Sequence, residues 1–317
     1  MNAHATAAEA AIAALADGQS PPPWPTLTGE TQRLLVNNRV AVAVAAGTDA
    51  GALDEARDLA WVTNVRSLAS ATRTSRALAA AGVRHVVVKG PALGLRLHGD
   101  AFLRPSADVD VVTAPKDESR AATVLAALGL AREAEHGTLY WRRFLGEAHF
   151  GPGDGRNAPV DLHLVLPHPS GRRRALASAV LSRAVPQRVG STTLPVPDPI
   201  DDLLLHAAYL AKSAARFEPA GGAMLDAAAA ARRLGPDRLQ EARRRATSLG
   251  LSGALSLALD PGRAATRARL LAQVLTGTLG RAASAVLACD GAGEALRALA
   301  FEAGRKAAQA AAHRGWF

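Results

Sequence analysis

The sequence predicts an α/β (α+β) protein: a mixed β-sheet flanked by helices, with N-terminal helices before it and a C-terminal helical domain after it. Alanine dominates the apolar residues and favours helix, and apolar positions recur at helical spacing. Short β-branched and alternating runs are confined to the middle of the chain. The 317 residues suit two or three packed units. We predict a helical segment at 1–80, an α/β domain at 81–197 and a helical domain at 198–317.

The first segment begins with an alanine-rich stretch, residues 3–17, that predicts a helix. The proline-rich run at 20–25 ends it and forms a stiff connector. Two further helices are expected at roughly 29–46 and 51–81, and Gly82 gives the second a C-cap signal.

The middle of the chain opens with residues 85–89, a β-branched run that predicts a buried strand. Gly90-Pro91 ends this strand, and a proline suits the first turn of a helix. The next expected elements are a short helix at 92–97, a loop at 99–105, an acidic strand at 106–113 and a helix at 117–128.

Two strands are then expected at 138–150 and 158–166, joined by a glycine-rich turn at 151–156. In the second strand Asp161 and His163 share one face, and the other face carries Val160, Leu162, Leu164 and Leu166. A proline-rich segment at 194–199 marks a boundary. Beyond it, helices are predicted at 200–216, 221–234, 236–249 and 251–259.

The net charge of +9 is compatible with nucleic acid, an anionic membrane surface or a phosphate-bearing substrate, and also with a coding bias towards arginine. The arginine triplets at 172–174 and 243–245 either contact phosphates or form solvated helix faces. Cys289 is the only cysteine, so no intrachain disulfide forms. Residues 1–19 lack the pattern of a secretory signal, and no apolar stretch has the length of a membrane span, so we expect a cytoplasmic protein without a membrane partner.

Asp108 and Asp110 are the most informative residues of the acidic strand. Side chains two apart on a strand point the same way, so both carboxylates can bracket divalent cations. The competing interpretation is a solvated edge strand that carries two acids. Asp161, on a strand that we expect to neighbour the first, offers a third carboxylate to complete a metal shell or accept a proton.

Several nearby residues are candidates for binding the phosphates of a nucleotide. At Lys89-Gly90, glycine lets the backbone approach a phosphate, and the N–H groups of the following helix favour an anion, although an ordinary turn has the same pattern. Arg104 offers a planar fork of donors and Ser106 a hydroxyl. Their competing interpretations are a loop arginine in water and a serine that caps a turn.

Two histidines and one further acid complete the candidates. His163 contributes to the nucleotide or metal site, or is a histidine with a structural hydrogen bond. His206 lies on the first helix of the last domain, from where it either reaches the nucleotide across a cleft or makes a helix–helix contact. Asp226 is expected as a helix-surface or capping acid.

Three carboxylates from two strands beside an anion-binding turn suit nucleotidyl transfer. An acceptor hydroxyl attacks the α-phosphorus of a nucleoside triphosphate such as ATP, and pyrophosphate leaves. Magnesium prefers carboxylate ligands together with substrate phosphates, so Mg²⁺ (or Mn²⁺) is the expected cofactor.

The motifs around Lys89-Gly90-Pro91, Asp108-Val109-Asp110 and Asp161-Leu162-His163 resemble those of the "uncharacterised nucleotidyltransferase" family, within the DNA polymerase β-like superfamily. The resemblance covers about residues 80–260. It implies a mixed sheet followed by a helical domain, and metal binding by the strand acids, with Asp161 as the third. It also implies a nucleoside triphosphate as substrate and an acceptor on a small molecule or peptide, in keeping with natural-product biosynthesis, whereas nucleic acid is not favoured.

The chain departs from the superfamily at the phosphate-binding turn. Gly-Ser is usual there, whereas this chain has Gly90-Pro91, which lacks the hydroxyl and one backbone donor. Lys89, Arg104 or Ser106 would compensate. One competing hypothesis is therefore a non-catalytic module of the same fold that binds nucleotide, RNA or protein. Another is a two-metal phosphohydrolase with mixed ligands, although the sequence lacks the denser histidine spacing expected for that class.

Overall fold

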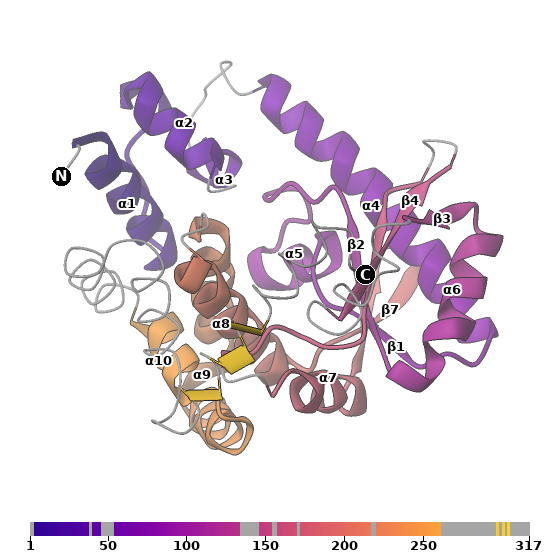
Figure 1. Ribbon diagram of the computed structural model, residues 1–317. Coiled ribbons are helices and arrows are strands. Elements are labelled where there is room, and N and C mark those ends of the chain that lie inside the picture. The colour runs from indigo at the N-terminus through magenta and orange to yellow at the C-terminus, as the bar shows by residue number, and fades with distance from the viewer. Residues whose placement is uncertain are drawn as a thin grey trace.

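The computed structural model describes residues 3–37, 40–45, 54–133, 146–153, 157–169, 172–216, 220–260 and six positions between 296 and 304. Its centre is a five-stranded mixed sheet with the order β1-β2-β5-β4-β3, and helices lie against both faces (Figure 1). The predicted fold class is confirmed: helices precede the sheet and helices follow it. No helix among the described residues is long and apolar enough to cross a membrane.

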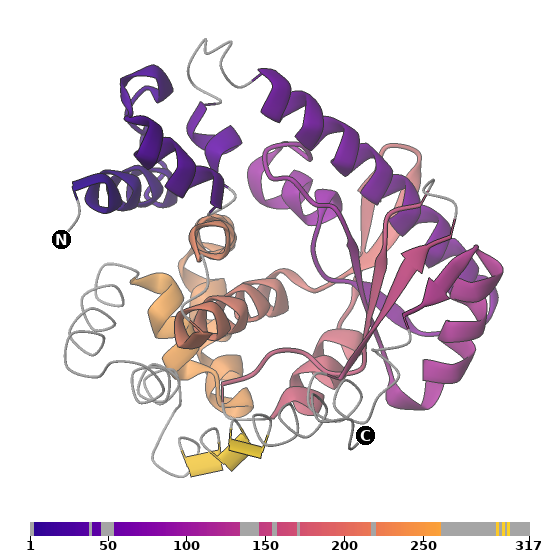
Figure 2. The same cartoon turned by 45° about the horizontal axis from the view of Figure 1, so that its top comes forward.

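The N-terminal helices form a layer of their own and then lead into the sheet. The short helices α1 (Ala3–Ala16), α2 (Gly29–Asn37) and α3 (Ala41–Ala45) pack together and against the C-terminal helix α9, away from the sheet, as Figure 2 shows. A single helix was expected at 29–46, and the structure has two there. Helix α4 (Asp54–Ala80) lies along the sheet, and residues 51–53 at the start of its predicted range fall outside the described residues.

The strands of the sheet are short, and one parallel pair lies at its centre. β1 (His85–Val87) is antiparallel to β2 (Val109–Thr113), which runs parallel to β5 (Val160–His163). β4 (Glu147–Pro152) pairs antiparallel with β5 and with β3 (Leu130–Arg132). The expectation that the strand of Asp161 neighbours the acidic strand is therefore confirmed.

The connecting helices of this part lie where the sequence places them. Helix α5 (Pro91–His98) follows β1 directly, and α6 (Glu118–Ala127) follows β2 after the turn η3 (Pro115–Asp117). One predicted boundary is wrong. Residues 151–152 belong to β4, where they pair with β3, rather than to the expected turn. Residues 138–145 of the expected strand and residues 154–156 of the turn lie outside the described residues.

The two faces of the sheet have different characters because strand residues alternate. Val109 and Val111 of β2, with Val160 and Leu162 of β5, pack in an apolar cluster with α4 and α6. The opposite face carries Asp110 and Asp161, and it continues into a second cluster that α7 (Arg173–Ser182) and the C-terminal helices cover. The alternation thus brings both acids to the face towards which the last helices pack.

The C-terminal helices are α8 (Pro199–Arg216), α9 (Gly221–Leu249) and α10 (Ser252–Leu259). The predicted helices at 221–234 and 236–249 are present as the two halves of α9, which a kink at Gly235 and Pro236 separates. The pieces expected beyond residue 260 fall largely outside the described residues. The domain boundaries at 80/81 and 197/198 stay predictions.

Candidate functional site

Two carboxylates lie side by side at the centre of the sheet. Asp110 of β2 and Asp161 of β5 are register partners on the parallel pair, and Asp110 is only 5% exposed. Asp110, Asp161 and His163 each offer one ligand atom, and these three atoms lie within 4.8 Å of one another. This grouping of hard oxygen donors with one imidazole suits a divalent cation.

Asp110 is held by two cationic or donor groups. Lys89 Nζ donates to Asp110 Oδ1 over 3.1 Å, and His163 Nε2 lies 2.7 Å from the same oxygen. Burial alone would raise the pKa of Asp110, but the charge of Lys89 and the hydrogen bond from His163 hold that pKa well below its usual value. The carboxylate therefore stays ionised at neutral pH and available to a cation.

Asp108 precedes β2 and has a different environment. Burial raises the pKa of its carboxyl, and the charges of Asp110 and Asp161 act in the same direction, against Lys89. Its carbonyl oxygen accepts hydrogen bonds from Ser67 Oγ of α4 (2.7 Å) and from Ser106 Oγ (3.2 Å). The three carboxylates repel one another, and a bound cation would relieve this repulsion.

Two histidine–glutamate pairs border the acids, and sequence reasoning missed three of their members. His149 of β4 contacts Asp161 through Nδ1, and its Nε2 lies 3.3 Å from Glu133. In the second pair, which lies two residues along the same strands, Glu147 Oε2 is 3.5 Å from His163 Nδ1. Glu147 and His149 alternate with the buried Ala148 and Phe150, so strict alternation along β4 is the signal that would have revealed them.

The turn after β1 brings its glycine close to Ser106. Gly90 has φ 80°, which favours glycine, and a Cβ there would lie 3.2 Å from Ser106 Oγ. Ser106 N donates to Asn64 Oδ1 over 2.6 Å, and Asn64 Nδ2 donates to the carbonyl oxygen of Arg104 over 2.8 Å. Asn64, another residue that sequence reasoning missed, thus fixes the loop that carries Ser106 beside the turn.

A buried polar network lies on the helical side of the site. Asp226 is 5% exposed, so the expected surface or capping acid is wrong. It forms an ion pair with Arg104 and accepts a hydrogen bond from His98 Nε2 (2.9 Å). His206 Nδ1 lies 3.7 Å from Asp226. The interpretation of Arg104 as a loop arginine in water is therefore wrong as well. A Cβ at Gly222 would lie 3.0 Å from Arg104 Nη2, so this glycine makes room for the guanidinium.

A pocket of about 470 Å³ lies between the sheet and helices α5, α8 and α9. Seven of the predicted site residues line it: Lys89, Gly90, Arg104, Ser106, Asp108, Asp110 and His206. Asp161 and His163 adjoin it through Asp110. The pocket adds Tyr209, over whose ring Lys89 Nζ lies at 3.9 Å, and Lys212, one helical turn from Tyr209. Burial raises the pKa of Tyr209 to about 12.

The arginine triplets lie outside this pocket. Arg173 and Arg174 begin helix α7, and residues 243–245 lie in the last turns of α9. Arg244 and Arg245 form ion pairs with Glu241. Contacts with phosphates at these positions stay a prediction.

The comparisons with known proteins point to one family. A sequence model of the uncharacterised nucleotidyltransferase family matches residues 38–261. None of the curated proteins matches the chain. Among solved structures, the solution structure of the antibiotic-resistance factor ANT(2'')-Ia, described as revealing substrate-regulated conformation dynamics, is similar with a TM-score of 0.43 and 14% sequence identity. That similarity covers 58% of this chain and 93% of the other.

Proposed function

We propose that this chain, which belongs to the uncharacterised nucleotidyltransferase family, transfers a nucleotidyl group from a nucleoside triphosphate to a hydroxyl or similar acceptor on a small molecule or peptide. The observation that carries the proposal is the register pairing of Asp110 with Asp161 beside a pocket lined by lysine and arginine. Acids and cationic donors along one pocket match a triphosphate bound with a divalent cation.

In this proposal Asp108, Asp110 and Asp161 hold divalent cations, Mg²⁺ or Mn²⁺. The spacing of the ligand atoms of Asp110, Asp161 and His163 fits one cation, and Asp108 lines the pocket next to Asp110. A bound cation would neutralise the charge that develops on the phosphoryl oxygens. Without a bound cation, the hydrogen bond from His163 to Asp110 keeps this carboxylate ionised and oriented.

The phosphates of the substrate are assigned to the part of the pocket that Lys89, Arg104 and Ser106 line, next to the acids. The ammonium of Lys89 and the backbone at Gly90 face the same space as Arg104 and Ser106. Ser106 Oγ lies beside the turn, 3.2 Å from where a Cβ of Gly90 would be, so its hydroxyl offsets the one that Pro91 lacks. Lys212 adds a further positive charge at the helical end.

The reaction is a displacement at the α-phosphorus. The acceptor oxygen forms a bond to this phosphorus while the bond to the bridging oxygen of the β-phosphate breaks, and pyrophosphate leaves. The proton of the acceptor hydroxyl passes to the carboxylate of Asp161, which is partly exposed and contacts His149. The wall formed by His206 and Asp226 is assigned to the acceptor or to the nucleoside.

The test follows labelled α-phosphate from each of the four ribonucleoside triphosphates into products of a cell extract, read by mass spectrometry. Asp108→Asn and Asp110→Asn should each abolish transfer, because a carboxamide is a poor ligand for a hard cation. The control is Asp237→Asn, an exposed acid on α9, which should leave transfer intact. Normal transfer by Asp110→Asn would refute the assignment of the site.

The alternative is a non-catalytic module that binds nucleotide, RNA or protein, and the Gly90-Pro91 turn is the observation that favours it. Calorimetry separates the two proposals. Nucleotide binding that needs no divalent cation and survives Asp108→Asn together with Asp110→Asn supports the module. If RNA is the ligand, its affinity should also fall steeply with salt.

A further inference from the structure

We propose that His163 is a nitrogen ligand of the cation held by Asp110 and Asp161, and that this imidazole makes the site prefer Mn²⁺ over Mg²⁺. The inference rests on the cation position of the proposed function and goes beyond it by assigning a ligand and an ion.

The position of the imidazole supports ligation. His163 Nε2 belongs to the group of three ligand atoms within 4.8 Å of one another, and it lies 2.7 Å from Asp110 Oδ1. Ligands of one octahedral ion at 2.0–2.1 Å lie about 3–4 Å apart, so small side-chain rotations bring all three onto one ion. His163 is buried, at 6% exposure, and comes from the same strand as Asp161.

The second nitrogen of the ring supplies the independent observation. Glu147 Oε2 lies 3.5 Å from His163 Nδ1, whereas the other ring nitrogen, Nε2, contacts Asp110. A histidine that ligates a metal almost always directs its other ring nitrogen to a carboxylate, carbonyl or water, which fixes the tautomer and raises the basicity of the ligating nitrogen. The same arrangement runs across strands β4, β5 and β2: the carboxylate of Glu147 lies behind the imidazole of His163, which faces the two acids.

The ligand set decides the ion. Mg²⁺ is a hard cation that takes oxygen ligands, whereas first-row transition ions also accept imidazole nitrogen. A site of three aspartates offers only oxygen ligands, which suit both ions. A site in which His163 replaces one oxygen or water ligand favours Mn²⁺.

The experiment measures cation binding by the full chain without nucleotide or acceptor, so it does not depend on transfer activity. Mn²⁺ binding is followed by electron paramagnetic resonance, and Mg²⁺ is added as competitor. His163→Asn should weaken Mn²⁺ binding about 10-fold or more, on the scale of losses seen when groups around a metal are removed. Mg²⁺ binding should change far less, because asparagine still offers an oxygen. The preference for Mn²⁺ should therefore fall.

A direct readout identifies the ligand. Spin-echo modulation from an imidazole nitrogen should accompany Mn²⁺ bound to the native chain and should disappear in His163→Asn. Glu147→Gln keeps the ligand and removes the carboxylate behind it, so it should weaken Mn²⁺ binding about 10-fold with the modulation retained. His168→Asn is the matched control: His168 Nε2 lies 2.7 Å from the Leu249 carbonyl oxygen, in another part of the fold.

An unchanged ratio of Mn²⁺ to Mg²⁺ affinity in His163→Asn, or an absent nitrogen modulation in the native chain, would overturn the proposal and leave His163 as a hydrogen-bond donor to Asp110. Selective Mn²⁺ binding by a chain that transfers no nucleotidyl group would instead refute the proposed function and leave this inference standing.

Discussion

At the residue scale, the carboxylate of Asp226 organises the helical wall of the pocket. It binds Arg104, lies 2.9 Å from His98 Nε2 and lies 3.7 Å from His206 Nδ1. Burial lowers the pKa of His98 to about 4, and the positive charge of Arg104 acts in the same direction. His98 is therefore neutral in the folded protein at pH 7, and it donates to Asp226 without adding a charge to the wall.

This neutral histidine gives the stability of the fold a dependence on pH. The folded pKa of His98 is about 4, below the ordinary histidine value of 6.5, so between these values the unfolded chain binds more protons. The free energy of unfolding should therefore rise with pH across this window and fall on acidification. At about 1.4 kcal/mol per pKa unit, the full loss amounts to about 3–4 kcal/mol.

The measurement is denaturant unfolding of the native chain and of His98→Gln between pH 7 and pH 4.5. Glutamine keeps a donor towards Asp226 but cannot gain a proton. The free energy of unfolding of the variant should therefore depend less steeply on pH. His168→Gln, outside the network, should keep the native dependence. Equal slopes in the native chain and His98→Gln would show that His98 does not titrate in this way.

The residues that sequence reasoning found and those that it missed differ in a physical respect. Asp108, Asp110 and Asp161 were predicted because their chemistry is visible in a local pattern, and strand alternation alone gives them a common face. Asn64 and Ser67 carry no such pattern, and the alternation that gives Glu147 and His149 a common face of β4 does not show which strand β4 pairs with. All four approach the acids only through tertiary packing: α4 crosses the loop before β2, and β4 pairs with β5.

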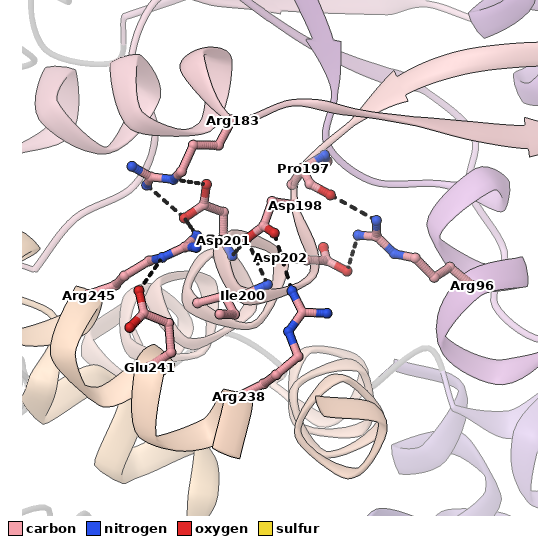
Figure 3. Close-up of polar contacts among 10 residues, drawn as sticks. All are labelled: Arg96, Arg183, Pro197, Asp198, Ile200, Asp201, Asp202, Arg238, Glu241 and Arg245. Atoms are coloured by element: carbon pink, nitrogen blue, oxygen red, sulfur yellow. Dashed lines mark hydrogen bonds and ion pairs between the residues drawn. The ribbon is translucent and has the colours of Figure 1, made fainter. Parts of the chain in front are cut away.

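At the scale of elements, the start of helix α8 joins several parts of the fold. Asp198 is its N-cap: Asp198 Oδ1 accepts from the backbone N–H groups of Ile200 (3.0 Å) and Asp201 (3.2 Å). Figure 3 shows arginines from other elements converging on this turn, and Arg238 is one of them, 3.4 Å from Asp198 Oδ2. Arg183 makes two hydrogen bonds to Asp201, Arg245 reaches Asp198 over 2.7 Å, and Arg96 reaches the neighbouring Asp202 over 2.6 Å.

Two substitutions at Asp198 separate its role as a cap from its role as a charge. Asp198→Ala removes both and should lower the free energy of unfolding by about 1–2 kcal/mol. Asp198→Asn keeps an oxygen that caps the helix and removes only the charge. Its loss should stay below about 1 kcal/mol, because the arginines that pair with Asp198 are partly exposed.

Thermal and denaturant unfolding of both variants at pH 7 provide the measurement. Comparable losses in the two variants would mean that the ion pairs with Arg238 and Arg245, rather than the cap, hold this end of α8. An unaffected Asp198→Ala variant would show that neither interaction contributes.

The elements themselves were predictable where a periodic pattern or a strong breaker defines them, as in α4, α5 and the two halves of α9. Helix α7 and the hairpin of β6 (Val185–Val189) and β7 (Thr192–Val196) were not predicted. This hairpin pairs Pro186 with Pro195 in a sheet of only two strands. Each strand of such a sheet has a free edge that tolerates proline, so Pro195, one of the prolines that indicated a boundary, lies in a paired strand.

At the scale of the whole molecule, the sheet and the C-terminal helices share one apolar cluster. Val86, Val88 and Val112 of the sheet region pack in the same cluster as Leu203 and Leu204 of α8. The N-terminal helices α1–α3 form a separate cluster that reaches the rest mainly through Leu225 of α9. The sequence predicted where the helical part begins, but not that its core is continuous with the sheet, because this continuity depends on which faces meet.

This shared core predicts that the sheet and α8 unfold together, although the sequence divides them at residue 198. Amide hydrogen exchange at increasing denaturant gives the free energy of opening of each element. Amides of β2 and α8 should converge on one value, because removing α8 would expose Val86 and Val112 to water. Amides of α1 should open at a lower free energy, since its cluster is rich in alanine and buries less apolar area. Opening of α8 at a clearly lower free energy than β2 would contradict the shared core. In that case the pocket between them would open without unfolding of the sheet, and the helical part would be an independent domain.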